Sequence, residues 1–360
     1  MDRMNPIQAH MEAALVTHVR WLVDDVSLRE GKVAICGWIA SLTDNFDKVK
    51  IWFCHTLSDD TALAPDQALG EHYPSLGKER FRRYVASAHQ HNLSREEGCF
   101  RFSITSGSTP NARTYRTAWF YPVDQACISI PDGDRIRRVI GTPNSTSYLT
   151  GGSTIVRRFD LYLQERFAKP IARFDRVLDW GCGSARLTNH LLRLNANTWG
   201  ADIDKDNIDW CNRNVRGGDG HFRHVSVNPP TPFGENEFEL VVGVSVFTHL
   251  GEEDQFRWLA ELARVMRPGG IALISIKGLS VFAMERTDPT VVEKLYADHF
   301  VTTGVNHDLS EYIEDSTYYK NVLHSPDYVF SCWSRYFEII DIIPGLALPQ
   351  DLVVMRKSSP

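Results

Sequence analysis

Residues 176–204 constrain the fold of this chain more than any other stretch. Residues 177–178 end a short apolar run typical of a buried parallel strand, and a turn with Gly181 and Gly183 follows it. Glycines there let the backbone turn sharply and approach a ligand before a helix begins. Asp202 ends the next strand, at about the 20-residue spacing at which an acid reaches a ribose diol. The stretch predicts a doubly wound α/β domain that binds a nucleoside.

Two details argue against a nicotinamide dinucleotide as the ligand. The third glycine of the G-x-G-x-x-G fingerprint is replaced by the bulky Arg186, and Asp179 precedes the turn, where it suits a cationic ligand better than a pyrophosphate. The block resembles motif I of class I S-adenosylmethionine (SAM)-dependent methyltransferases, with Ala185 in place of the last glycine. The alternative is a glycine turn in another doubly wound protein.

The resemblance continues over roughly residues 143–360. The family's fourth strand is similar to segment 233–245, and the helix start after it is similar to segment 246–250. Its fifth helix, turn and strand are similar to segment 259–275. Segments 336–343 and 352–356 resemble its last two strands. The implied fold is α/β, a seven-stranded doubly wound methyltransferase sheet with an antiparallel last strand, and the implied cofactor is SAM.

The resemblance also implies a set of cofactor-binding residues. Val227 and Asn228 are expected at the adenine edge, and a segment with Tyr148 and Gly152 is expected to fold over the methionine end; an interdomain hinge is the alternative for that segment. Asn228-Pro-Pro is similar to a motif of nucleobase methyltransferases, but Thr231 replaces its aromatic residue and it follows the third strand, not the fourth. The expected cofactor-binding residues are Asp179, Gly181, Cys182, Gly183, Asp202, Ile203, Val227, Asn228, Ser245, Tyr148 and Gly152.

Residues 1–142 belong to a different domain. Apolar spacing over 4–24 predicts a helix, after which alternating runs predict a small antiparallel β-domain resembling a sandwich. Segment 73–92 is charged and predicts a helix packed on that sandwich. The Gly37-Trp38 run resembles Gly-Trp modules of bacterial glycan-biosynthesis proteins. A linker over 140–147, rich in Gly, Pro, Asn and Ser, leads to the methyltransferase domain at 143–360.

Composition limits the partners. The net charge of −6 gives no general attraction to nucleic acid or anionic membrane, and no apolar run is long enough to span a bilayer. Seven scattered cysteines without a C-x-x-C pair predict reduced thiols and no metal site. We expect a cytoplasmic protein that acts on a small-molecule or glycan acceptor, with a homo-oligomer as one form it can take.

His249 follows the fourth strand, whose end borders the transferred methyl group in this fold. A hydroxyl acceptor needs a base within hydrogen-bond reach, whereas a neutral amine needs much less. His249 is the candidate general base; the alternative is that it caps or packs the next helix. The long segment 278–333 is rich in histidine and aromatic residues, and its candidates for acceptor contact are Tyr318, His324 and Trp333.

The sequence thus predicts a SAM-dependent methyltransferase that methylates a hydroxyl of a sugar or polysaccharide intermediate. An N- or O-methyltransferase of a small natural product is the alternative. A SAM-binding or glycan-binding scaffold without turnover is a third possibility, from a different functional class.

Overall fold

The computed structural model describes residues 19–29, 31–41, 46, 49–53, 56–72, 78–89, 100–106, 113–120, 128–217, 220–278, 280–281, 288–306, 317–347 and 349–358. The chain divides into two compact units, Met1–Gln125 with Leu149–Thr154, and Ala126–Tyr148 with Ile155–Pro360. None of the helices in the described ranges combines the length and the apolar character that a membrane crossing needs.

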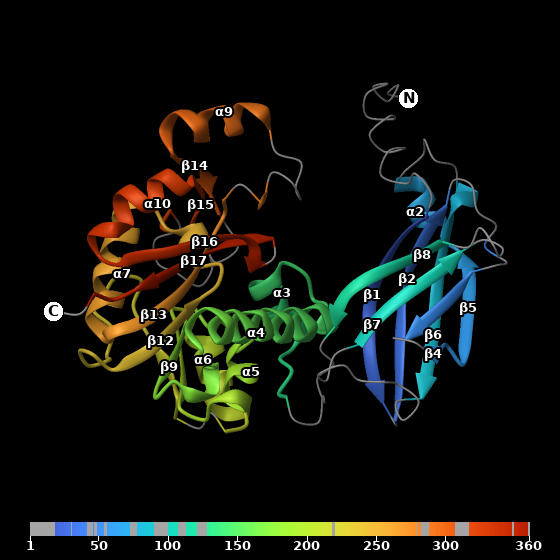
Figure 1. Ribbon diagram of the computed structural model, residues 1–360, viewed down its shortest axis with the longest axis horizontal. Helices are drawn as coiled ribbons and strands as arrows, with labels where there is room; N and C mark the ends of the chain where they lie inside the picture. Colours follow the sequence, from blue (N-terminus) through green and yellow to red (C-terminus); the bar gives the residue numbers. More distant parts are fainter. Residues whose placement is uncertain are drawn as a thin grey trace. The chain divides into compact units, whose positions relative to one another are not determined.

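The first unit contains two four-stranded antiparallel sheets (Figure 1). Their strand orders are β1 (Val19–Arg29), β2 (Lys32–Ser41), β6 (Phe81–His89), β5 (Asp60–Pro65), and β4 (Thr56–Leu57), β3 (Lys50–Phe53), β7 (Phe100–Ser106), β8 (Arg113–Phe120). Short helices α2 (Gln67–His72) and η3 (Lys78–Arg80) precede β6. One apolar cluster joins the sheets through Val33, Ile35, Ile39, Ile51, Phe53, Tyr84, Ala86, Ala88 and Ile104. The prediction of an antiparallel β region is confirmed.

Two helices predicted for this region are corrected. Residues 19–24 of the predicted helix 4–24 belong to strand β1, and its earlier part lies outside the described residues. Within segment 73–92, residues 81–89 form β6, where Tyr84, Ala86 and Ala88 are buried and alternate with more exposed positions. Val85, an apolar residue on the outer face with 53% of its surface exposed, lies between buried Tyr84 and Ala86 and hides the two-residue period in the sequence.

The second unit is built on a seven-stranded mixed sheet. Its order is β11 (Phe222–His224), β10 (Thr198–Asp202), β9 (Val177–Trp180), β12 (Phe238–Gly243), β13 (Met266–Ile276), β17 (Gln350–Arg356), β16 (Glu338–Ala347). Strand β17 runs antiparallel to both β13 and β16, and the other pairs are parallel. The predicted α/β class and antiparallel seventh strand are therefore confirmed.

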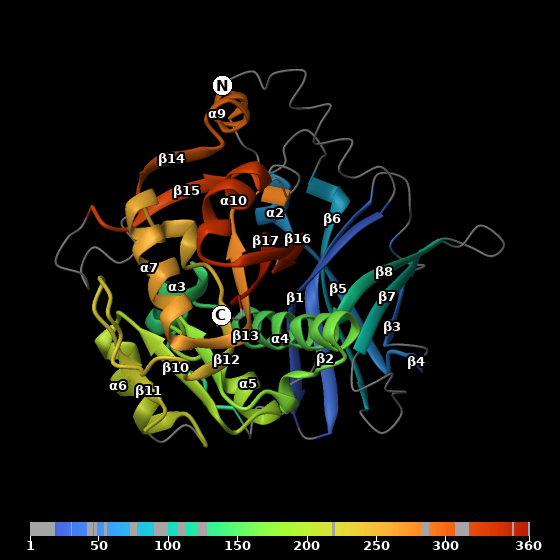
Figure 2. The same ribbon diagram turned by 60° about the vertical axis from the view of Figure 1, so that its left-hand side comes forward.

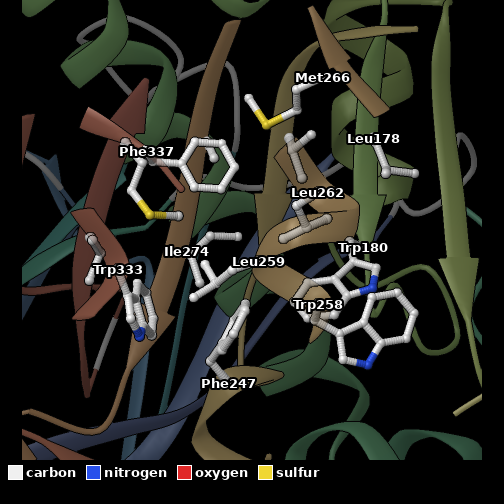
Figure 3. Close-up of a cluster of buried hydrophobic side chains, with 14 of the residues drawn as sticks. Leu178, Trp180, Phe247, Trp258, Leu259, Leu262, Met266, Ile274, Trp333 and Phe337 are labelled. Carbon is white, nitrogen blue, oxygen red and sulfur yellow. The ribbon is translucent and has the colours of Figure 1, made fainter. Parts of the chain in front are cut away.

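Helices cover both faces of this sheet (Figures 1 and 2). Successive strand residues alternate between two cores, so that Val177 and Leu273 pack with α4 (Ser145–Phe167) and α5 (Thr188–Leu194). Leu178 and Ile274 pack with α7 (Glu252–Val265) and α10 (Pro326–Cys332) in the larger core shown in Figure 3. Within that core, the ring of Trp180 lies about 5 Å from the rings of Phe247 and Trp258.

The expected interdomain linker, 140–147, joins α3 (Gly133–Ile140) to α4. Gly141 caps the end of α3 in a left-handed conformation, with φ of 77°, and Asn144 caps the start of α4 by accepting from the backbone N–H of Ser147 at 2.8 Å. The turn residues that the sequence shows there thus end one helix and begin another. Helix α4 starts at residue 145, earlier than the predicted 153.

The remaining elements of the unit include a pair of strands that borders the loop after β12. Helices α6 (Lys205–Asn214) and α9 (Pro289–Asp298) complete the unit, together with η6 (Ile171–Arg173) and η8 (Trp333–Arg335). Strands β14 (Phe300–Val305) and β15 (Lys320–His324) form an antiparallel pair inside the long segment between β13 and β16. Tyr319, just before β15, bridges to Leu250, just after η7 (Phe247–His249). The inserted pair therefore borders the end of the fourth strand of the fold.

The buried side chain of His324 supports η7 through Gln255. It has no exposed surface, and its Nε2 lies 3.0 Å from Oε1 of Gln255. The amide nitrogen of Gln255 donates to the carbonyl oxygens of Phe247 at 3.2 Å and Leu250 at 2.9 Å. The histidine thus fixes the orientation of an amide that holds both ends of η7.

We expect His324 to make the protein sensitive to acid. Burial lowers the pKa of its ring to about 3, whereas an unfolded histidine titrates near about 6.5. Between these values the unfolded state binds the extra proton, so His324 contributes full stability above pH 6.5 and loses it as the pH falls, by about 1.4 kcal/mol per pH unit. Urea unfolding of the parent and of His324→Asn from pH 7 to pH 4.5 measures this slope.

The variant should be less stable at pH 7 but should lose less stability on acidification than the parent does. His224→Asn, which changes an exposed histidine, is the control and should keep the parent's slope. Equal slopes in the parent and His324→Asn would show that the buried ring does not govern the acid response.

Candidate cofactor site

The turn between β9 and α5 forms the floor of the site. Gly181 and Gly183 have φ angles of 75° and 52°, which other residues rarely adopt. A Cβ atom on Gly181 would overlap the side chain of Val246, and one on Gly183 would lie 2.8 Å from Cγ2 of Val139. Ala185 has φ of 69°, so the position where the resembling family has its last glycine is left-handed here as well. The local backbone therefore requires the motif's glycines on both conformational and steric grounds.

Asp202 links this turn to the end of β10. Its Oδ2 accepts from the backbone N–H of Gly183 at 2.7 Å, and its Oδ1 accepts from that of Asp204 at 2.8 Å. Burial raises the pKa of the carboxyl to about 6, against these two donors, which favour the charged form. Each oxygen keeps a second acceptor position, so the carboxylate is oriented to receive a pair of hydroxyl groups.

Asp179 is a second buried carboxylate, with 2% of its surface exposed. The hydroxyl of Thr188 donates to its Oδ2 at 2.6 Å, and burial raises its pKa to about 6. A carboxylate that is costly to ionise without a partner is stabilised by a bound cation. The site therefore favours a ligand with positive charge near β9.

Two adjoining cavities open at the carboxyl ends of β9, β10 and β12. The larger, of about 450 Å³, includes the predicted residues Asp179, Gly181, Cys182, Gly183, Asp202, Ser245 and His249 in its wall. The smaller, of about 90 Å³, is mainly apolar and includes Ile203, Val225, Val246, Leu250, Trp258 and Tyr318. Both are lined by Gly181, Asp202, Ser245 and Tyr319. Nine predicted residues are thus brought to one continuous site, seven in the larger cavity and two, Ile203 and Tyr318, in the smaller.

Ser245 is held by a hydrogen-bond network at the end of β12. Its φ is 63°, and its backbone N–H donates to the hydroxyl of Ser275 at 2.8 Å. The hydroxyl of Ser275 donates to Oε1 of Gln350 at 2.6 Å, and the amide of Gln350 donates to the hydroxyl of Ser245 at 2.7 Å. This closed network stabilises an unusual backbone conformation where two cavities meet.

His249 lines the larger cavity from η7. Its Nδ1 lies 2.9 Å from the carbonyl oxygen of Lys320, and because that oxygen can only accept, Nδ1 carries the proton of the neutral ring. The amide nitrogen of Asn306 is farther away, at 3.4 Å, and also donates to Asn321. Tyr319 stacks on the imidazole with 4.3 Å between ring centroids. The ring is held in the tautomer in which Nε2 is the nitrogen that accepts protons.

The predicted lid is corrected to a support beneath the turn. Tyr148 and Gly152 lie within α4, and neither lines the cavities. Tyr148 is 1% exposed, and its hydroxyl donates to the carbonyl oxygen of Ser184 at 2.6 Å. Burial raises the pKa of this phenol, so it retains the proton that makes the bond. A side chain without exposed surface does not close over a ligand.

Val227 and Asn228 lie behind the smaller cavity and not in its wall. The carbonyl oxygen of Val227 accepts from the hydroxyl of Tyr318 at 2.6 Å and from the indole of Trp258 at 3.3 Å. The side chain of Asn228 accepts from Arg257 at 3.3 Å. Val227 therefore positions two wall residues, and Tyr318, expected at the acceptor, lies at the apolar cavity instead.

His324 and Trp333, also expected at the acceptor, are core residues. Both have no exposed surface and line neither cavity. The ring of Trp333 packs on Phe247, with 4.9 Å between ring centroids, in the cluster of Figure 3. Their burial removes direct contact with an acceptor, and their role is to support η7 from behind.

Helix α3 is a part of the site that the sequence analysis missed. Arg135 donates to both carboxylate oxygens of Asp206 at 2.7 and 2.8 Å, and Arg138 donates to Asp206 at 2.8 Å and pairs with Asp204 at 3.4 Å. These ion pairs place residues 137–141 in the wall of the larger cavity. The amphipathic pattern and the capping Asp132 predict a helix there, but no local signal shows which distant carboxylates its arginines meet.

Further residues of the larger cavity's wall were not predicted, among them Arg186, Lys277 and Gln350. Tyr319, from the aromatic segment 278–333, lines the cavity as well. Arg186 lies inside the glycine motif, where the sequence points to its bulk and not to its charge. Lys277 follows β13, and Gln350 begins β17. A residue at the carboxyl end of a parallel strand, such as Lys277, can be recognised as a candidate from the sequence alone.

The residues present fit SAM. The glycine turn is a cradle that any Cβ would fill, Asp202 is oriented for the ribose hydroxyls, and the apolar cavity beside Ile203 suits the adenine ring. Asp179 suits the positively charged methionine end. Buried Nε of Arg186 has no hydrogen-bond partner among the described residues, which leaves a donor for a ligand group.

Replacement of Asp202 by Asn should weaken SAM binding about tenfold. The change keeps the size of the side chain and turns charge-assisted hydrogen bonds to the ribose into neutral ones, a difference of about 1.4 kcal/mol. The amide nitrogen of Asn also cannot accept from the backbone N–H that one carboxylate oxygen now receives, so any further loss has the same sign. Isothermal titration with SAM measures the loss. Asp209→Asn, the same change on the exposed face of α6, is the control. Parent-like affinity in Asp202→Asn would contradict the ribose assignment.

Affinity for SAM should also fall in acid. Asp179 and Asp202 have pKa values of about 6, and a bound cationic ligand favours their ionised forms. Protonation of either carboxyl before binding costs affinity, so the dissociation constant should rise about tenfold per carboxyl between pH 7 and pH 5. Titration across this range tests it, and Asp202→Asn should show a shallower rise. A flat profile would mean that neither carboxylate faces the ligand's charge.

The chain is similar to known methyltransferases. A family model described as a methyltransferase domain matches residues 177–270. Ubiquinone biosynthesis O-methyltransferases from Sinorhizobium fredii and Mesorhizobium japonicum are 29% and 30% identical over 119 and 112 residues. Each match covers 31% of this chain and 47% or 43% of the relative, so the chain spans less than half of the relatives it matches.

The chain also matches a solved methyltransferase structure at low identity. The 1,6-didemethyltoxoflavin-N1-methyltransferase from Burkholderia thailandensis, solved with S-adenosylhomocysteine, is 17% identical, with a TM-score of 0.41. The alignment covers 67% of this chain and 96% of that one. With the family match, the glycine turn and Asp202 in one site, the chain carries a SAM-dependent methyltransferase domain that includes residues 177–270.

Proposed function

We propose that the protein is a SAM-dependent O-methyltransferase that uses His249 as its general base. The observation that carries this proposal is the tautomer of His249, fixed by the carbonyl oxygen of Lys320 in the wall of the larger cavity. A hydroxyl acceptor must lose its proton during transfer, and an amine that is already neutral does not need such a base. The name of the relatives, ubiquinone biosynthesis O-methyltransferase, agrees with oxygen as the accepting atom.

The chain's residues divide the work of the reaction. Bound SAM supplies a methyl group whose carbon is already activated, because it is attached to a positively charged sulfur. The turn at 181–183 and Asp202 hold the cofactor, and Nε2 of His249 takes the proton of the acceptor hydroxyl as its oxygen becomes the nucleophile. The imidazolium that forms keeps its Nδ1–H bond to Lys320, which stabilises the positive charge. Stacked Tyr319 restricts the ring to this orientation.

We propose a hydroxyl of a sugar or polysaccharide intermediate as the acceptor. Polar groups suited to such an acceptor lie near His249 in the larger cavity, among them Ser245, Lys277 and Gln350, and the ring of Tyr319 offers an aromatic surface. The Gly37-Trp38 resemblance of the N-terminal unit favours a glycan. The relatives' name, ubiquinone biosynthesis O-methyltransferase, favours an acceptor on the way to a quinone, a small-molecule alternative. Release of S-adenosylhomocysteine with nucleotide sugars, glycan extracts and catechols separates these possibilities.

Turnover with sugars alone would support the first acceptor class, and turnover with catechols alone would replace it. Binding of SAM without turnover on any acceptor would favour a scaffold without catalysis. Each outcome is read against a parallel SAM titration, which reports whether the cofactor site is intact.

His249→Ala should lower kcat by about 10²- to 10⁴-fold and leave SAM affinity unchanged, because a general base acts mainly in the transition state. His249→Gln is the companion variant, since it retains a polar group but cannot take the proton. We measure kcat above pH 8 with the acceptor found in the panel. Full kcat in His249→Ala there would show that the histidine only packs against Tyr319 and takes no proton in the reaction.

A further inference from the structure

Lys277 places a positive charge in the wall of the larger cavity, directly after the end of β13. Its side chain is half-buried. In the part of the chain that the structure describes, its ammonium group has neither a hydrogen bond nor an ion pair. An ammonium group that loses hydration and gains no protein partner is costly unless a ligand supplies a negative charge. The position therefore points to an anionic group on a ligand.

The carboxylate of Asp351, on the neighbouring strand, does not neutralise Lys277. Asp351 stands opposite Ile276 in the antiparallel pairing of β13 and β17. Its Oδ1 accepts from the backbone N–H of Gly345 at 2.9 Å, and its Oδ2 accepts from that of Ser280 at 3.4 Å. Paired residues share one face of a sheet and successive residues alternate between faces, so the pleat directs Lys277 away from Asp351. The charge of Lys277 is thus left to the cavity.

Lys277 also lies apart from the residues assigned to the cofactor. The turn at 181–183 and Asp202 follow or end β9 and β10, whereas β13 is separated from β9 by β12, a spacing of about 10 Å. The polar wall residues on this far side carry no formal charge apart from Lys277 in the described structure; they are Ser245, His249, Tyr319 and Gln350. Lys277 is therefore the charge that an acceptor meets beside the cofactor.

Strand β15 holds Lys277 and the candidate base in one frame. At its start, the carbonyl oxygen of Lys320 accepts from Nδ1 of His249 at 2.9 Å. At its end, the backbone N–H of His324 donates to the carbonyl oxygen of Lys277 at 2.9 Å. His249 and Lys277 follow β12 and β13, which are parallel neighbours, at the same edge of the sheet. An acceptor that reaches His249 in this cavity is therefore within reach of Lys277.

We propose that Lys277 binds a carboxylate or phosphate group of the acceptor and so makes the enzyme select acidic acceptors over neutral ones. This inference rests on the proposed function, since it specifies the acceptor of the same site. An ammonium group attracts either anion as a point charge, so the shared feature of the acceptors is their negative charge. A sugar acid, a sugar phosphate and a phenolic acid all meet this requirement. A neutral counterpart leaves Lys277 unpaired.

Matched neutral and anionic probes test the assignment by isothermal titration into protein saturated with S-adenosylhomocysteine. Glucose is compared with glucuronate and with glucose 6-phosphate, which distinguishes a carboxylate from a phosphate. Catechol is compared with protocatechuate, its carboxylated form. The proteins are the parent, Lys277→Met, Lys277→Arg and Lys294→Met. Lys294 is exposed on α9 and serves as the matched control.

In the parent, at least one anionic probe should bind about 10- to 100-fold more tightly than its neutral partner, the range for a charged hydrogen bond. Lys277→Met should lose this preference. It should keep the parent's affinity for S-adenosylhomocysteine, which also shows that the variant is folded. Lys277→Arg should retain most of the preference, because it keeps the charge, and Lys294→Met should match the parent throughout.

Equal affinity of the parent for the neutral and anionic members of every pair would overturn the inference, and so would a preference that persists in Lys277→Met. Weaker binding of S-adenosylhomocysteine to Lys277→Met would overturn it as well, because it would place the lysine at the cofactor. Failure of the parent to bind S-adenosylhomocysteine would instead contradict the proposed function itself. The two failures are therefore distinguishable in one set of titrations.

Discussion

The carboxylate of Asp202 is the contact on which the rest of the site depends. It joins two backbone segments that are distant in sequence, the turn after β9 and the loop after β10, through one hydrogen bond to each. The backbone N–H groups of Gly181 and Cys182 add to these bonds by donating to the carbonyl oxygen of Ala201 in β10 at 2.8 and 3.0 Å, and together they set the separation of the two segments. That separation defines the floor of the larger cavity, and every other wall element, from α3 to η7, is placed around it.

A second constraint acts from the inserted strands β14 and β15. The carbonyl oxygen of Lys320 selects the tautomer of His249, and His324, at the other end of β15, orients the amide that holds η7. One short strand thus sets both the position and the protonation pattern of the candidate base. The insertion is the most variable kind of element in a doubly wound fold, yet here it completes the site that the sheet begins.

The sequence predicted what local chemistry determines. The strand, glycine turn and acid of 177–202 were located because each leaves a short-range signal, and the antiparallel last strand followed from family resemblance. Strand β6 was missed because the exposed Val85 stands between the buried Tyr84 and Ala86, so the sequence shows an apolar run where the structure alternates. His324 and Trp333 were assigned to the surface of a cavity because residue type does not reveal burial. The pairing of Arg138 with Asp206 joins helices 68 positions apart in the chain, and no local pattern encodes it.

Asp179 and Asp202 lower the stability of the apoprotein. Both carboxyls are desolvated enough that their pKa values are raised to about 6, so at neutral pH the folded chain holds two negative charges that solvent would accommodate better. Natural proteins tend to concentrate such costs where they bind or react. The binding site of the ligand-free protein therefore carries a free-energy cost from these two charges, and a bound cation lowers that cost. Cells that run short of the cofactor would hold this protein in its less durable form, which ties its lifetime to the supply of the molecule it uses.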